Sequence, residues 1–120
     1  GGDGSGGLAA AAEAARADRD SVVASLASPD GTTSVEVIID QDGHGYLLAG
    51  SLPSLPDDRT YQLWGVINDQ AISLGVLGRS PELETFSVEG ELTALVITNE
   101  VAGGVISDGN MDGAWIGAIA

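Results

Sequence analysis

Thr60-Tyr61-Gln62-Leu63-Trp64-Gly65-Val66-Ile67-Asn68 is the best strand candidate in this sequence, and we expect the chain to be built around it. In an extended strand, successive side chains point to opposite faces. One face then carries Tyr61, Leu63 and Ile67, and the other carries Gln62, Trp64 and Val66. Both faces are largely apolar, and a large aromatic side chain left in water forfeits roughly 1.5–3 kcal/mol of burial. The pattern therefore predicts a central strand that is covered on both sides.

Alternating apolar residues predict six further short strands, at residues 35–39, 46–49, 71–77, 85–88, 92–99 and 114–119. Two runs of turn-forming residues, Asp40-Gln41-Asp42-Gly43 and Asn68-Asp69, join their flanking strands into hairpins. Short strands with turns at roughly 8–12-residue spacing are typical of a sandwich or a small barrel. We expect an all-β domain over residues 31–120, an antiparallel β-sandwich of about seven short strands.

The first 30 residues have a different character. Residues 1–7 are glycine-rich, which indicates a flexible leader, and residues 8–26 are alanine-rich with scattered charge, which favours helix. The apolar stripe of that helix is thin and Arg19 interrupts it, so the helix is marginal without a neighbour. Two interpretations stay open: a partly helical spacer, or a helix that docks against the domain or a second chain. Ser28-Pro29-Asp30-Gly31 ends the segment, which makes residues 1–30 a leader and spacer.

Composition excludes several classes of function. The 120 residues suffice for one domain and carry a net charge of -14, with 18 acidic residues, four arginines and no lysine. Such a surface repels phosphate groups, so we expect neither nucleic-acid binding nor electrostatic docking on a membrane. Cysteine is absent, which rules out thiol catalysis and disulfides. No apolar run approaches the ~18–20 residues of a membrane helix.

Candidate catalytic groups are sparse. His44 is the only histidine and belongs to an Asp- and Gly-rich turn, and no Gly-x-Ser-x-Gly elbow offers a serine nucleophile. Gly103-Gly104 lacks the spacing of a dinucleotide fingerprint, and a phosphate loop needs a lysine that the chain does not have. We expect a protein that is not an enzyme and that needs no cofactor, with His44 as a surface residue of its turn.

One run resembles half of a metal site. Asp108-Gly109-Asn110-Met111-Asp112-Gly113 matches the first half of a calcium loop, in which side-chain oxygens alternate. The twelfth position falls on Ile119, which offers no carboxylate. We therefore expect a plain turn; if calcium binds, Asp108, Asn110 and Asp112 are its candidate ligands.

Four motifs in a fixed order resemble one family. They are Leu52-Pro53-x-Leu55-Pro56, Thr60-Tyr61-Gln62-Leu63-Trp64, Ser73-Leu74-Gly75-Val76 and Thr98-x-Glu100-x-Ala102-Gly103-Gly104. Together they resemble the extracytoplasmic C-terminal domain of RskA-type anti-sigma-K factors, over about residues 28–120. The resemblance implies that eight residues are structural family positions: Tyr61, Gln62, Leu63, Trp64, Gly75, Glu100, Gly103 and Gly104.

The resemblance also implies a setting. Such a protein crosses a bacterial cell membrane once, holds a sigma factor through an N-terminal cytoplasmic domain, and places this domain outside. A site-1-type protease that cuts the spacer allows regulated intramembrane proteolysis, which frees the sigma factor for transcription. This chain would then be a sensory or regulatory domain for signal transduction, with the cytoplasmic domain and membrane helix outside its 120 residues. The alternative is an exported β-sandwich that binds carbohydrate, peptide or calcium through its end loops.

Overall fold

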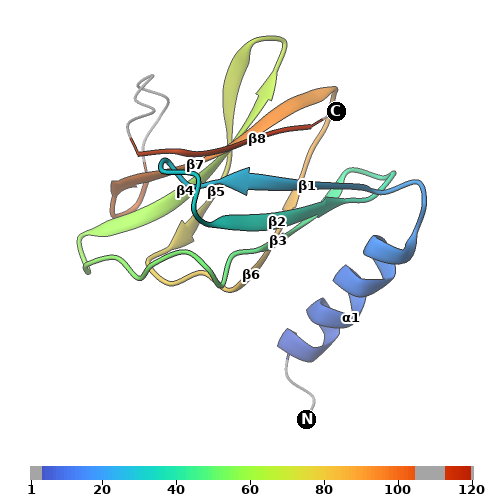
Figure 1. Cartoon of the computed structure of the whole chain (residues 1–120), viewed down its shortest axis with the longest axis horizontal. Coiled ribbons are helices and arrows are strands. Elements are labelled where there is room, and N and C mark those ends of the chain that lie inside the picture. Colours follow the sequence, from blue (N-terminus) through green and yellow to red (C-terminus); the bar gives the residue numbers. More distant parts are fainter. Residues whose placement is uncertain (1–3, 105–112, 120) are drawn as a thin grey trace.

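The structure, a computed structural model, describes residues 4–104 and 113–119. One helix, α1 (Gly4–Ala17), precedes the strands (Figure 1). The strands within the described residues are β1 (Val22–Ala27), β2 (Ser34–Ile39), β3 (His44–Leu48), β4 (Arg59–Ile67), β5 (Gln70–Gly78), β6 (Leu83–Ser87), β7 (Leu92–Val101) and β8 (Trp115–Ala118). All neighbouring strands pair antiparallel, which confirms the all-β expectation. The described residues form eight strands, not the seven expected, because β1 was not predicted.

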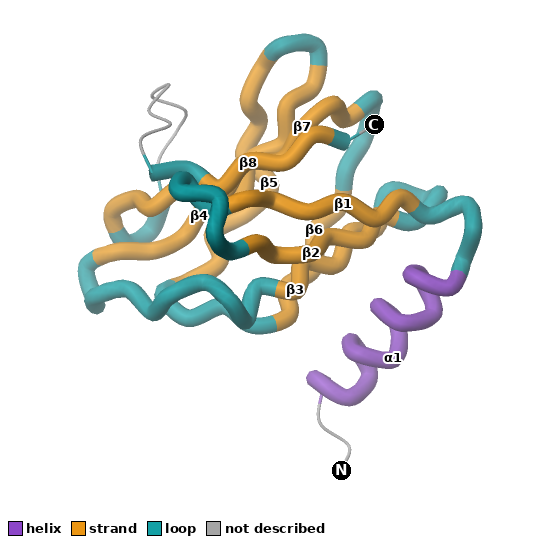
Figure 2. The backbone as a smooth tube through the Cα atoms, viewed as in Figure 1, coloured by secondary structure: helices purple, strands orange, loops and turns teal. Residues whose placement is uncertain are grey.

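The strands form one sheet, not the two layers of a sandwich. Their order is β5-β4-β7-β8-β1-β2-β3-β6, and the sheet curls until its two end strands, β5 and β6, touch. Figure 2 shows the strands wrapping round a common centre. The architecture is a nearly closed, barrel-like sheet, so the expected sandwich is wrong.

The strands form one sheet because of β1. Residues 22–27 were expected to end a helix, but they form a strand that pairs with β2 from Val22↔Ile39 to Ala27↔Ser34. On its other side, Ala27 of β1 pairs with Ile116 of β8. Without β1, the order would separate into β5-β4-β7-β8 and β2-β3-β6, which are the two sheets of a sandwich. The missed strand is therefore the one that joins them.

The main core lies inside this curled sheet. Its buried side chains come from β1, β2, β3, β4, β6, β7, β8 and the segment after β3, and Leu74 and Leu77 of β5 pack against them. They are Leu26, Val35, Val37, Leu47, Ala49, Leu52, Tyr61, Leu63, Phe86, Leu95, Ile97 and Trp115. Because every strand faces one shared interior, the core is that of a barrel.

Strand β4 is the central strand that the sequence predicts. It lies between β5 and β7, with Tyr61 and Leu63 in the main core. On its other face, Trp64 is 4% exposed and packs with Val96 and Ala114 in a separate cluster. The expected burial on both faces is confirmed.

Helix α1 covers part of the sheet's outer surface. Its Ala12 and Ala15 are 3% and 9% exposed and pack on Ile38 of β2. This contact confirms docking against the domain, the second of the two interpretations of the alanine-rich segment. The helix begins at Gly4, within the expected flexible leader, and ends at Ala17. No helix in the described part of the chain has the length and hydropathy to cross a membrane.

Candidate functional site

Four polar side chains are buried on the outer face of β4 and β7, where an apolar surface would be expected. They are Thr60, Gln62, Thr98 and Glu100, and each is at most 5% exposed. In the register of the two strands, Thr60 lies opposite Glu100 and Gln62 lies opposite Thr98. We call these four residues the polar row.

Hydrogen bonds of the polar row link three strands, β4, β5 and β7. Trp64 Nε1 donates to Thr98 Oγ1 at 2.8 Å, which links β4 to β7. Gln62 Nε2 donates to Ser73 Oγ at 2.8 Å, and the Gly78 amide donates to Thr60 Oγ1 at 2.9 Å, so β4 is linked to β5 as well. A buried polar group is stable only when it is paired, so these bonds fix the register of the three strands.

The two most specific motifs of the sequence meet at Gly104. A Cβ atom at Gly104 would lie 2.6 Å from Cγ2 of Val76 and 3.0 Å from Oε1 of Gln62. Its φ of 81° also belongs to the left-handed region, where glycine is favoured. The loop after β7 therefore folds onto β4 and β5, held further by the Ala102 amide, which donates to the Asp58 carbonyl at 2.9 Å. Residues about forty positions apart in the chain form one contact.

Tyr61 anchors the inner face of β4. Its hydroxyl donates to the Pro53 carbonyl at 2.6 Å, and its ring belongs to the main core. Burial raises the pKa of this phenol above its ordinary value. Tyr61 therefore ties the proline-containing connection before β4 to the interior, as a packing residue and not as an exposed ligand.

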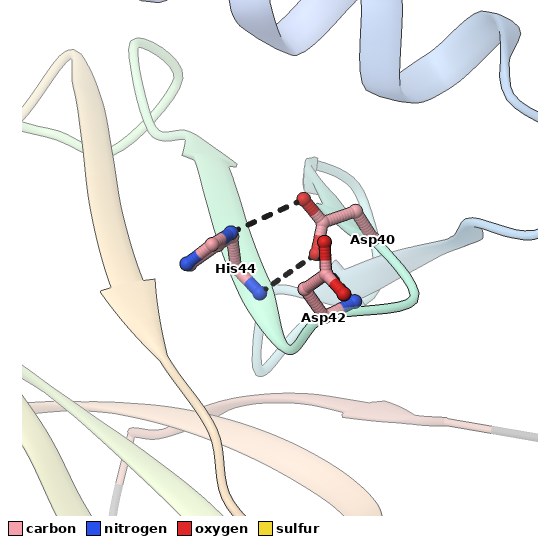
Figure 3. A network of polar contacts seen from close by, with 3 residues as sticks. All are labelled: Asp40, Asp42 and His44. Atoms are coloured by element: carbon pink, nitrogen blue, oxygen red, sulfur yellow. Dashed lines mark hydrogen bonds and ion pairs between the residues drawn. The ribbon is translucent and has the colours of Figure 1, made fainter.

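The second candidate site is the turn between β2 and β3, which holds Asp40, Asp42 and His44 (Figure 3). Their potential ligand atoms all lie within 4.8 Å of one another, the one such group of acidic or histidine side chains in residues 4–104 and 113–119. Oδ1 of Asp40 accepts from the amides of Asp42 and His44, both at 2.9 Å, and Oδ2 lies 3.4 Å from His44 Nδ1.

These contacts explain the turn as local structure. Burial alone would raise the pKa of Asp40, but the amides of His44 and Asp42 and the nearby imidazole outweigh burial, so the pKa lies below its ordinary value. The His44 side chain is 62% exposed, in agreement with the expected surface position. The calcium ligands considered in the sequence, Asp108, Asn110 and Asp112, lie outside the described residues.

The eight predicted family positions do not include every residue of the polar row and its hydrogen-bond partners. Thr60, Ser73 and Thr98 supply the hydroxyl partners, whereas the predicted family positions supply Gln62, Trp64 and Glu100. The available signal was the polar alternation at 60 and 62 and at 98 and 100 in otherwise apolar strands. Placing these residues opposite each other required the strand register.

The fold and the polar row define a small, barrel-like β domain in which five of the motif residues are buried: Tyr61, Gln62, Leu63, Trp64 and Glu100. A family model described as anti-sigma-K factor rskA, C-terminal, matches residues 6–109. This range spans most of the chain and all eight motif positions, so the chain belongs to that family. No curated protein and no solved structure matched the chain.

Proposed function

We propose that this chain is the extracytoplasmic regulatory domain of a membrane-anchored anti-sigma factor. The observation that carries the proposal is the family match over residues 6–109, together with the place of its motif residues. Tyr61, Trp64 and Gly104 lie at packed contacts, where they maintain the shape of the domain. These three residues that mark the family are thus residues that pack inside the domain.

The proposed mechanism is control of proteolysis by a folded body. A cytoplasmic domain of the full-length protein holds the sigma factor, and a membrane helix connects that domain to this one. While the β body is folded, it limits access of a site-1-type protease to the segment before the sheet. Paired strands resist proteolysis, because cleavage needs a locally unfolded chain. The domain itself catalyses no reaction in this scheme.

Charge supports the absence of a nucleic-acid role. A net charge of -14 disfavours contact with phosphate backbones and with anionic lipid head groups. The anchor would keep the domain near the membrane, but the domain would not bind the membrane surface. Contact with the sigma factor is left to the cytoplasmic domain.

The proposal is tested in cells that carry the full-length protein, its sigma factor and a sigma-dependent reporter. Trp64→Ala removes a buried ring, which costs roughly 3–5 kcal/mol, and should raise reporter output without any external signal. Ile116→Ala, at a half-exposed position, is the matched control and should leave output at the wild-type level. An unchanged reporter with a domain shown to be unfolded by Trp64→Ala would contradict control of proteolysis by the fold.

A further inference from the structure

Helix α1 is held to the sheet by a thin contact. The side chains that it buries against Ile38 are alanines, and Tyr46, Leu48 and Leu83 beneath it are only partly buried. Open hollows of about 470 Å³ and 260 Å³ flank it, the first lined by Ala11 and the second by Ala9. A surface of large apolar residues is therefore only partly filled by small ones, which leaves much of the available burial unused.

Polar contacts add little to this docking. Arg16 Nη2 forms an ion pair with Oε1 of Glu36 on β2, and both side chains are about one-third exposed. Arg16 Nε lies 3.7 Å from Glu13 of the same helix, which does not bind it to the sheet. Ion pairs of this exposure are screened by salt and stabilise weakly.

The link between α1 and β1 contains an unsatisfied group. Residues 18–21 join the end of the helix at Ala17 to the start of the strand at Val22. Among the described residues, Ser21 Oγ is the one buried side-chain polar atom without a hydrogen-bond partner. Burying a hydroxyl without a partner is unfavourable, so the docked state carries a penalty that is relieved when the link opens.

The helix cannot persist once it leaves the sheet. It has 14 residues, and its first turns contain Gly4, Gly6 and Gly7, each a poor helix former. Isolated helices of this length are marginal in water even with good sequences. Detachment would therefore convert residues 4–21 into one continuous unfolded segment.

We propose that α1 is a latch, which opens while the barrel-like sheet stays folded. With the latch closed, the four residues 18–21 are held between a docked helix and a paired strand, too short a segment to extend into a protease active site. With the latch open, residues 4–21 form a long extended segment that a protease can bind. The opening itself follows from the contacts described above; its consequence for the protease rests on the proposed function.

Hydrogen exchange of the whole chain, followed by mass spectrometry of peptides, tests the latch. In the wild type, α1 amides should exchange at least about tenfold faster than those of β4 and β7, because they open without the sheet. Ser21→Ala removes the unsatisfied hydroxyl and should slow α1 exchange by about tenfold. Equal exchange of α1 and β4 in the wild type would overturn the proposal.

Matched helix variants separate docking from helix propensity. Ala9→Leu adds apolar volume at the smaller hollow and should slow α1 exchange by about tenfold, whereas Ala14→Leu, at a position that lines neither hollow, should not. Ala12→Asp places a charge in the buried contact and should release α1 with β4 and β7 still protected; Ala14→Asp is its control. Equal effects of the two leucine variants, or loss of β4 protection in Ala12→Asp, would refute the latch. If α1 opens as described but the sigma-dependent reporter does not respond, the proposed function is refuted and the latch is not.

Discussion

Trp64 and Thr98 lie on neighbouring strands, 34 positions apart in the chain, and share one hydrogen bond in a buried environment. Neither residue faces the main core, so their contact stabilises the outer surface of the sheet. At the scale of single residues, the family motif is thus a set of paired polar and aromatic groups.

Trp64→Phe and Thr98→Val should each lower the free energy of unfolding by about 1–3 kcal/mol, because each leaves the other's buried polar group unpaired. The double variant should lose less than the sum of the two, with a coupling energy of about 1 kcal/mol. Urea denaturation of the four proteins measures this. Strict additivity would show that the bond contributes nothing to stability.

Gly104→Ala should destabilise more than Gly103→Ala. Both glycines have positive φ, at 81° and 96°, so each alanine bears a conformational penalty of roughly 1–2 kcal/mol. Only the Cβ at position 104 overlaps Val76 and Gln62, whereas nothing lies within 4 Å at position 103. The difference in denaturation midpoints should therefore correspond to a further 1–3 kcal/mol, roughly.

The nearest atom to that Cβ belongs to Val76, so Val76→Ala in the Gly104→Ala background should restore part of the loss. Equal destabilisation at positions 103 and 104 would mean that the loop does not approach β4 and β5 as described.

Asp30, in the turn between β1 and β2, gives an acid-dependent contribution to stability. Hydrogen bonds from Ser28 Oγ at 2.6 Å and from the Thr32 amide and hydroxyl lower its pKa from 3.8 to about 2. A depressed folded-state pKa contributes stability above about pH 4 that is lost as the pH falls towards 2.

The wild type should therefore have a higher Tm than Asp30→Asn near neutral pH, and the difference should shrink between pH 4 and pH 2. Asp20→Asn makes the same charge change in the link after α1 and serves as the control. A difference in Tm for Asp30→Asn that is constant from pH 7 to pH 2 would contradict the assigned role.

At the scale of elements, β1 and the β4–β5 hairpin show what local sequence determines. The hairpin was predictable because alternating apolar strands flank a two-residue turn, and its ends pair as Ile67↔Gln70. Residues 22–27 follow an alanine-rich helix and contain a single fully buried side chain, Leu26, so no alternation of core residues distinguished them from helix. Their strand conformation comes from pairing with β2, which local periodicity does not reveal.

Asp69→Gly should stabilise the β4–β5 hairpin. Asn68 and Asp69 both adopt positive φ, 54° and 64°, as a type I′ turn requires, and Asn-Gly is its preferred sequence. Glycine removes the strain of a left-handed aspartate, so the free energy of unfolding should rise by about 1 kcal/mol with an unchanged denaturant m-value. A lower denaturation midpoint would show that Asp69 makes a stabilising contact that outweighs its strain.

For the whole molecule, the sequence predicted which residues form strands better than it predicted that the strands join into one barrel-like sheet. The seven strands after residue 31 follow from apolar alternation and turn residues, and the buried positions of Tyr61, Leu63 and Trp64 were predictable for the same reason. Sandwich and barrel share that alternation, and the choice between them depended on β1. Likewise, polar alternation marks Thr60 and Thr98 in the sequence, but their hydrogen-bond partners depend on strands that meet only in the fold.

Our main proposal is that the folded β body resists a protease, and that it limits but does not abolish access to the segment before β1, which therefore opens first. Limited proteolysis of the folded chain by a protease of broad specificity, with the first products identified by mass, tests it most directly. The first cuts should fall between residues 4 and 21, and the product from Val22 onwards should persist. First cuts between Tyr61 and Val76, inside the β4–β5 hairpin, would contradict the claim.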